Sequence, residues 1–269
     1  IKAPTGTRIG VTDRYIQRVE KDIREVIPKK DLGIVVSNIG VTPGFSSMYT
    51  SNSGQDTATV QVSLNKENRL GSYAYMNLVR NKLADDLAEL STYFQTGGLV
   101  DSVVNLGLPA PIDIQVSGKN LKASYQTAAE IAGKIRQLKD VSDVMIPQDL
   151  NYPSLRVNIN REMSAKLGLS SKEVVDNVIT ALNSNQMISP SYWVDPKSGN
   201  DYLLTVQYPE KQIESMQDLK NIPLRGAKST LTTQLGAVSD IKMIESPTEV
   251  DHYQLQRVID VYVSPASED

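Results

Sequence analysis

The sequence predicts an α+β protein made of repeated β-α-β, ferredoxin-like units, with an inserted subdomain that carries a β-hairpin. Two observations indicate this class. Short strand patterns that alternate apolar and polar residues are interleaved with amphipathic helix patterns along the 269 residues. The pattern then restarts at Ile112, after a stretch punctuated by Gly97, Gly98, Gly107, Pro109 and Pro111. The strands alternate apolar and polar residues, whereas the strands of a continuous parallel sheet are apolar on both faces. We therefore expect small sheets that are covered by helices on one face.

The first half begins with a strand pattern at Ile1–Pro4. A helix follows, which Thr12 can cap and which ends before Pro28. Its apolar residues recur at helical spacing: Ile16, Val19, Ile23, Val26 and Ile27. Strands are predicted at 33–39 and 57–64, separated by a long loop rich in Gly, Ser, Thr and Asn, and a second helix is predicted at about 72–91.

The second half repeats this order and then changes. Strands at 112–117 and 141–146 enclose a helix whose apolar residues run from Leu121 to Leu138. The next section has a strand at 155–160, a short helix at 161–167 and a capping-box pattern at Ser170 and Glu173. A hairpin with strands at 191–194 and 202–206, a short helix near Met216 and a final strand at 258–263 complete the chain.

Composition excludes several functional classes. Lys and Arg total 28 against 31 Asp and Glu, so the basic surplus of a nucleic-acid binder is missing. The chain has no Cys and one His, which excludes disulfides and thiolate sites and disfavours His-based metal sites and catalytic triads. No apolar run approaches the ~18 residues of a membrane-spanning helix. Both ends fall inside or just after strand patterns, so we expect the chain to be a segment of a longer protein.

Two motifs have residues that could form a chemical site. The turn Asp195–Asp201 has oxygen-bearing side chains, but Lys197 stands where a calcium loop needs a carboxylate, so a plain hairpin turn is the better interpretation. His252 has no nucleophile or motif near it in the sequence. We therefore expect no catalytic residue, no metal ligand and no cofactor, and the protein is not predicted to be an enzyme.

Several motifs occur in an order that resembles one family. These are Ala3–Arg8 (APTGTR), 107–116 (GLPAPIDIQV), 165–170 (AKLGLS) and 255–261 (LQRVIDV). In order and spacing they resemble the second periplasmic loop of resistance-nodulation-division (RND) efflux pumps of the hydrophobe/amphiphile exporter branch. The resemblance implies a first porter subdomain at 1–108, the first part of a second porter subdomain at 109–150, a docking subdomain at 151–248, and a returning, incomplete strand of the second porter subdomain at 249–269.

The same resemblance implies a function. Such a loop is the periplasmic substrate-binding and docking portion of a proton-driven, trimeric inner-membrane antiporter of a Gram-negative bacterium. The proton-coupling residues of the antiporter lie in its membrane part. The pump exports amphiphilic drugs or other small molecules through a periplasmic adaptor (membrane fusion) protein and an outer-membrane channel, and so confers multidrug and antibiotic resistance. The missing Cys, the single His and the lack of paired Met motifs argue against the metal-exporting branch. The alternative is a periplasmic scaffold or adaptor domain that binds only protein partners.

Candidate substrate contacts lie first on the loop at 39–54, which resembles the family's switch loop. Its large side chains are Phe45, Met48 and Tyr49. From the residues alone, these side chains could either form a surface that binds ligands or pack onto the sheet as plugs that bind nothing. The resemblance favours the ligand surface, for which an adaptable Met is suited.

The other candidate contacts lie on strands. Gln61 stands where drug exporters carry an aromatic residue, which predicts a more polar deep pocket. Gln115, Met145 and Asp260 match cleft-lining positions, and Met145 replaces a cation, which disfavours selection of anionic substrates. Asp260 interrupts an apolar strand and is expected to face solvent or the cleft.

Overall fold

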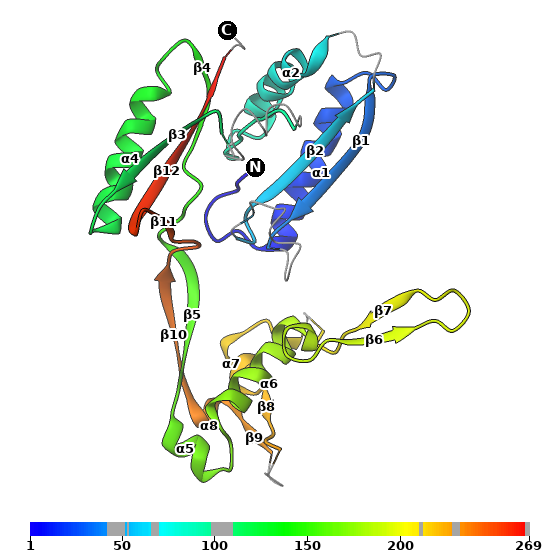
Figure 1. The fold of residues 1–269 in the computed structure, drawn as a ribbon, viewed down its shortest axis with the longest axis vertical. Helices are drawn as coiled ribbons and strands as arrows, with labels where there is room; N and C mark the ends of the chain where they lie inside the picture. Colours follow the sequence, from blue (N-terminus) through cyan, green and yellow to red (C-terminus); the bar gives the residue numbers. More distant parts are fainter. Residues whose placement is uncertain are drawn as a thin grey trace. The chain divides into compact units, whose positions relative to one another are not determined.

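The computed structural model describes residues 1–41, 52, 54–65, 70–97, 110–209, 212–227 and 232–266. The chain divides into two compact units, each considered by itself: unit 1 comprises residues 1–153 and 245–269, and unit 2 comprises residues 154–244. Helices and strands are labelled in Figure 1.

The first part of unit 1 packs two helices against a β-hairpin. Its elements are α1 (Ile9–Val26), β1 (Leu32–Ile39), β2 (Ala58–Leu64) and α2 (Gly71–Asp86). Strands β1 and β2 are antiparallel, with Val36 opposite Gln61. The helices and hairpin share a core made of Ala3, Val19, Ile23, Ile27, Tyr75, Val79, Leu83, Leu87 and Leu90. The strands predicted at 33–39 and 57–64 are thus confirmed to within a residue.

Three details of this part differ from the prediction. Only Lys2 of the expected first strand forms bridges, to Thr57 and to Ser91, so residues 1–3 lie between β2 and residues 91–97. Thr12 does not cap α1: the helix begins at Ile9, and the buried Thr12 hydroxyl donates to the Arg8 carbonyl at 3.3 Å. Helix α2 ends at Asp86, although the next apolar residues, Leu87 and Leu90, still reach the core.

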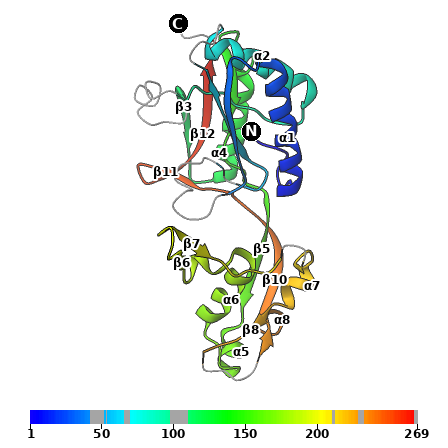
Figure 2. The same cartoon turned by 90° about the vertical axis from the view of Figure 1, so that its right-hand side faces the viewer.

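The second part of unit 1 is a four-stranded antiparallel sheet with one helix. Its elements are β3 (Ile112–Ser117), α4 (Leu121–Ile135), β4 (Val141–Met145), β11 (Asp251–Tyr253) and β12 (Gln256–Pro265). Strand β12 pairs with β11, β3 and β4. Helix α4 lies along β3 and β12, as Figure 2 shows, and its Ala128 and Ala132 pack on Ile259, Val261 and Val263. Alternate residues of β12, including Asp260 and Tyr262, therefore lie on the opposite face of the sheet.

Unit 2 has its own core. The chain enters it through β5 (Tyr152–Ile159) and leaves it through β10 (Ser239–Ser246), which pair with each other. Between them come α5 (Arg161–Lys166), α6 (Ser171–Asn183), a 3₁₀ turn η2 (Asn185–Met187), β6 (Ser191–Val194), β7 (Asp201–Leu204), α7 (Met216–Lys220), β8 (Pro223–Leu224), β9 (Thr233–Gln234) and α8 (Leu235–Val238). Helix α6 supplies Val174 and Ala181 to the core.

Local sequence signals determine several features of unit 2. The predicted capping box is present: Ser170 Oγ accepts from the Glu173 N–H at 3.2 Å, and Glu173 returns the bond to the Ser170 N–H at 2.8 Å. The predicted hairpin is also present, with Trp193 opposite Tyr202. Its turn is closed by Asp195, whose carboxylate accepts from the N–H groups of Lys197 and Ser198. The mixed fold of repeated β-α-β units with a hairpin-bearing insertion is confirmed.

Candidate functional site

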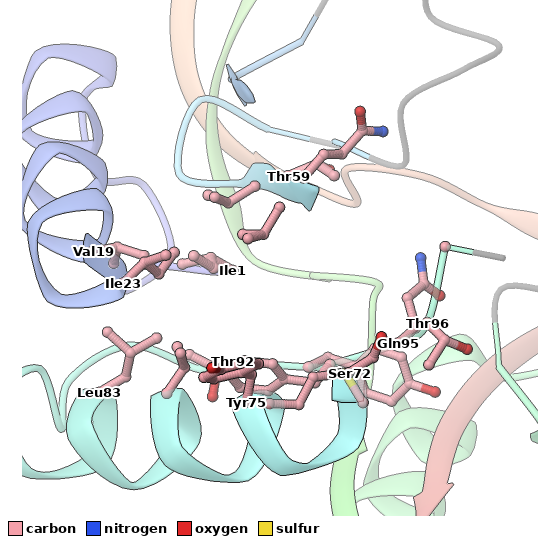
Figure 3. A pocket seen from close by; sticks show the side chains of 18 of the residues that line it. Ile1, Val19, Ile23, Thr59, Ser72, Tyr75, Leu83, Thr92, Gln95 and Thr96 are labelled. Carbon is pink, nitrogen blue, oxygen red and sulfur yellow. The ribbon is translucent and has the colours of Figure 1, made fainter. Parts of the chain in front are cut away.

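A cavity of about 1820 Å³ lies within unit 1, between the β2 strand, the two helices of the first part and the edge of the second sheet. Figure 3 shows Val19 and Ile23 projecting toward it from α1, and Leu83 and Tyr75 from α2. The apolar floor exists because these helical residues recur at i, i+3 and i+4 and so face the same way. The rim is more polar and includes Thr59, Gln95 and Thr96.

The second sheet contributes a smaller wall. Met145 at the end of β4, together with Pro147, Glu249 and Tyr262, lines the same cavity. Burial, followed by the nearby Asp251 carboxylate, raises the pKa of Glu249 to about 7. Burial also raises the pKa of the Tyr262 phenol far above its ordinary value, with Asp260 as the next cause. This wall therefore holds a neutral phenol and a carboxyl group that takes up a proton near neutral pH.

The candidate residues fall into three places. Gln61 is exposed on β2, and both it and Met145 line the cavity. Gln115 and Asp260 do not line it but are direct cross-strand partners on β3 and β12. Phe45, Met48 and Tyr49 lie outside the described residues.

Of the two expectations for Asp260, solvent or the cleft, the structure contradicts solvent. It is only 5 % exposed, because it sits on the central strand of the sheet. Gln148 Nε2 donates to Asp260 Oδ2 at 2.6 Å and to Asp251 Oδ2 at 2.7 Å, and the Asp260 N–H donates back to Gln148 Oε1 at 3.2 Å. The fully buried Gln148 thus holds two carboxylates together.

Carboxyl groups gather on this face of the sheet. Gln115 Nε2 donates to Asp113 Oδ2 at 3.1 Å. Burial, followed by the Asp260 charge, raises the pKa of Asp113, and burial likewise raises the pKa of Asp260. The second oxygens of Asp113 and Asp260 are buried without a hydrogen-bond partner among the described residues. The face therefore carries an excess of negative potential that favours a cationic neighbour.

The two parts of unit 1 are joined by ion pairs that the sequence did not indicate. Arg80 on α2 contacts Asp143 on β4 at 2.7 Å, and Lys2 contacts Asp149 at 2.9 Å. Ser264 Oγ lies 3.0 Å from the Tyr93 hydroxyl. These partners are far apart along the chain, so neither spacing nor periodicity could have revealed them.

The described residues contain no group of three or more His, Cys, Asp or Glu side chains arranged to hold a metal ion. None of the helices in the described ranges is long and apolar enough to cross a membrane. What the geometry offers is a large, mostly apolar cavity beside an acidic sheet face, which suits binding more than covalent chemistry.

Comparisons with known proteins support the efflux family but not the amphiphile-exporter branch, because the similar proteins and solved structures are named for cation efflux, metal resistance or heavy metal efflux. The family model described as the AcrB/AcrD/AcrF family matches residues 1–269. Similar curated proteins include the "Putative cation efflux system protein SilA" of Salmonella typhimurium, 26% identical over 168 residues, which are 62% of this chain and 15% of that protein. Another is the "Nickel and cobalt resistance protein CnrA" of Cupriavidus metallidurans, 30% identical over 76 residues, or 28% of this chain and 7% of that protein.

Solved structures share the fold. Two crystal forms of a heavy metal efflux pump match with TM-scores of 0.76 and 0.75 at 17% identity. They cover 100% and 98% of this chain, and 27% and 26% of the pump chains. This chain therefore spans about a quarter of the solved pumps and a smaller share of the curated relatives. Because the family model matches it from end to end, the chain belongs to the AcrB/AcrD/AcrF family.

Proposed function

We propose that this chain is the periplasmic substrate-handling and docking part of a proton-driven inner-membrane efflux transporter of a Gram-negative bacterium. The observation that carries the proposal is the family match over residues 1–269. The fold supports it, because the two β-α-β parts of unit 1 line one cavity. On this assignment, residues 1–108 form the first porter subdomain, 109–150 and 249–269 belong to the second, and 151–248 form the docking subdomain.

The docking role rests on unit 2. All four residues of β6 are exposed, and the hairpin presents Tyr192, Trp193 and Tyr202 to solvent. Aromatic residues of this kind are frequent in protein interfaces. We therefore assign to this unit the contacts with an adaptor protein and an outer-membrane channel, in a homotrimer of the full-length protein.

The substrates we propose are amphiphilic small molecules, with a preference for cationic ones. The apolar cavity suits the hydrophobic part of such a molecule, and the Asp113 and Asp260 carboxyls beside it suit a positive charge. The candidate contacts are Gln61, Gln115, Met145 and Asp260, with Phe45, Met48 and Tyr49 on the loop.

Metal cations are the second candidate substrate class. The printed names of the curated relatives, cation efflux and nickel and cobalt resistance, favour it. Against it, the described residues offer no three-ligand cluster, and the chain has no Cys and one His. A cationic amphiphile needs only charge and apolar surface, whereas a transition metal needs converging ligands.

The test is export by the full-length protein in a Gram-negative strain that lacks its own efflux pumps. Susceptibility is measured to lipophilic cations, neutral amphiphiles, and nickel, cobalt, zinc and silver salts. We expect protection against lipophilic cations, and a selective loss of it in Asp113→Asn, whereas Asp240→Asn in unit 2 serves as the matched control. Protection against metal salts alone would favour the second class. Purification with adaptor and channel but without protection against any compound would favour the scaffold alternative.

A further inference from the structure

Two buried carboxylate oxygens in the second sheet of unit 1 lack a hydrogen-bond donor. They are Oδ1 of Asp113 on β3 and Oδ1 of Asp260 on β12, and neither has a partner among the described residues. The Asp260 residue is only 5% exposed. A buried acceptor without a donor costs free energy, so a ligand that brings donors to this place would be bound.

The register of the sheet makes these two carboxyl groups neighbours. Gln115 is directly opposite Asp260, and Asp113 is directly opposite Tyr262, on the adjacent strands β3 and β12 of Figure 1. All four side chains lie on the face of the sheet that points away from α4. Asp113 and Asp260 are therefore diagonal neighbours on one face, which is a relation in which side chains interact. Accordingly, burial and then the Asp260 charge raise the pKa of Asp113.

The amide groups nearby are used on the other carboxylate oxygens. Gln148 Nε2 has two N–H groups, and it donates to Asp260 Oδ2 at 2.6 Å and to Asp251 Oδ2 at 2.7 Å. Gln148 Oε1 accepts from the Asp260 N–H at 3.2 Å, which fixes the orientation of this buried amide. Gln115 Nε2 donates to Asp113 Oδ2 at 3.1 Å. Gln148 is thus a positioning residue that holds Asp260 by Oδ2 and leaves Oδ1 for a ligand.

We propose that Asp113 and Asp260 form a subsite for an ammonium group that carries N–H bonds, as in protonated primary and secondary amines. Such a group brings a positive charge and at least two donors, one for each Oδ1 atom. A quaternary ammonium ion brings the charge but no donor, so it would leave both oxygens unpaired. The inference rests on the proposed transport function, because it narrows the cationic amphiphiles proposed above to those with N–H donors.

Gln115 is the group that the ligand displaces. Its side chain is exposed, whereas Gln148 is fully buried, so Gln115 can rotate away without disturbing the core. Its amide donates to Asp113 as an ammonium group would, but without a charge. Because charge-assisted hydrogen bonds are stronger than neutral ones, an ammonium group is expected to take the place of this amide.

The rest of an amphiphile would meet apolar surface on the same face. Tyr262 is opposite Asp113 on β3 and opposite Met145 on β4. Tyr93 lies beside Tyr262, with ring centroids 6.3 Å apart. These rings also define the competing hypothesis, because aromatic faces bind quaternary ammonium ions. Two cations that share one tail but differ in their N–H groups distinguish the two hypotheses.

The first experiment compares dodecylamine with dodecyltrimethylammonium in binding to the 269-residue chain, at concentrations below micelle formation. The side-chain amide NMR signals of Gln115 and Gln148 report on the subsite. We expect dodecylamine to shift both signals with a Kd about tenfold or more below that of the quaternary ion. Equal affinities, or tighter binding of the quaternary ion, would overturn the proposal. A response to nickel chloride alone would indicate a metal site, and no response to any probe would indicate a proton shared by the carboxyls; either result would also overturn it.

The decisive variant is Gln115→Ala, for which a gain is expected. Without the amide that has to be displaced, dodecylamine should bind several-fold more tightly and the quaternary ion as before, which a damaged fold could not produce. The matched control is Gln17→Ala, since Gln17 is an exposed amide that donates to Asp13 Oδ2 at 2.8 Å and should leave both affinities unchanged. Asp113→Asn should remove the preference for the amine. No gain in Gln115→Ala, a gain for both cations, or an unchanged preference in Asp113→Asn would overturn the subsite.

Export by the full-length transporter separates this inference from the proposed function. A strain that lacks its own efflux pumps is exposed to the same two compounds, and we expect Asp113→Asn to reduce protection against dodecylamine by a larger factor than protection against the quaternary ion. Selective binding of dodecylamine without protection against either compound would support the subsite and refute the transport function. Equal protection against both compounds, with equal losses in Asp113→Asn, would support transport of cations and overturn the subsite.

Discussion

Arg80 and Asp143 form a two-pronged salt bridge between α2 and β4, with Nε 2.8 Å from Oδ1 and Nη2 2.7 Å from Oδ2. Their side chains are 19% and 5% exposed. Asp143 Oδ2 also accepts from the Phe94 N–H at 3.3 Å, and the Arg80 guanidinium lies 4.8 Å from the Phe94 ring centroid. One ion pair therefore ties together three segments of unit 1.

Removing one partner of this pair should cost more than removing both. Asp143→Asn leaves a mostly buried guanidinium without its counter-charge, and we expect a loss of about 3 kcal/mol in the stability of unit 1. The Arg80→Met, Asp143→Leu double variant should lose less than Asp143→Asn, because no charge remains unpaired. Amide exchange of core residues of unit 1 measures both.

The matched control is Asp86→Asn, on the same helix as Arg80. Asp86 pairs with Lys82 at 2.8 Å, but both side chains are about a third exposed. A solvent-exposed pair contributes little to stability, because water and salt screen it. If Asp86→Asn destabilised unit 1 as much as Asp143→Asn, the bidentate contact would not be the reason for the loss.

In unit 2, Glu173 should matter more than its capping partner Ser170. Ser170→Ala removes an N-cap side chain, worth about 1 kcal/mol. Glu173→Ala removes the return bond to Ser170 and also the 2.8 Å bond that Oε1 accepts from the Ala227 N–H. Urea unfolding followed by Trp193 fluorescence reports on this unit, since Trp193 is the only Trp.

The control on this helix is Lys172→Ala. Lys172 forms an exposed pair with Asp176 four residues later, so its loss should cost a few tenths of a kcal/mol. A Glu173→Ala variant no less stable than Ser170→Ala would show that the bond to Ala227 contributes nothing.

Glu249 should make unit 1 more stable as the pH falls from about 7 to 5. The pKa of its carboxyl rises from 4.5 to about 7 on folding, so the folded state binds a proton more tightly than the unfolded state does. Stability therefore decreases as the pH rises through this window. The groups that act on Glu249 are Asp251, Lys2, Asp260 and Asp149.

The size of this effect is limited by solvent. A full shift would correspond to about 3 kcal/mol, and because Glu249 is partly exposed we expect about 1–2 kcal/mol. Glu249→Gln should be more stable at pH 7 and should flatten the dependence between pH 5 and 7. Thermal unfolding across this range measures it, and an unchanged slope in Glu249→Gln would assign the dependence to other groups.

Elements with a clear local signal were predictable. Alternation gave β3 at Ile112–Ser117 without error, and the Ser170 and Glu173 spacing identified the start of α6. The prediction that Thr12 caps the first helix was wrong. Inside a helix, a Thr hydroxyl can donate to the backbone carbonyl four residues earlier, as Thr12 does to Arg8, as readily as a Thr can cap a helix. Such a choice depends on where the helix meets its core, which a single motif does not contain.

The candidate site was predictable only in part. The family resemblance selected Gln61 and Met145, and both line the cavity. The expectation that Asp260 could face solvent was wrong, although a polar residue in an apolar strand ordinarily faces water. In this protein Gln148, which lies 112 positions earlier, donates a hydrogen bond to the Asp260 carboxylate and takes the place of water. Partners at that separation are set by tertiary packing, for which the sequence has no local signal.

In the full-length transporter, Phe45→Ala combined with Met48→Ala should reduce export of bulky substrates and leave the fold intact. If the loop at 39–54 contributes these side chains to the substrate surface, their removal takes away apolar contact worth about 1.5–3 kcal/mol for each fully buried side chain. We expect the stability of unit 1 not to change, because among the residues that the structure describes the core of its first part lies on α1, α2 and the adjoining segments. Drug-susceptibility assays at matched expression levels measure export, and amide exchange measures the fold.

The matched control is Val79→Ala, which shortens a core residue that also lines the cavity from α2. It should lower the stability of unit 1, because α2 helps to form the core, whereas the loop double variant should not. Smaller substrates should be exported by the double variant at close to the normal level, because they need fewer apolar contacts. If resistance to every exported compound stayed at the wild-type level while unit 1 lost stability, Phe45 and Met48 would be plugs that pack onto the sheet, and the loop would not touch substrate.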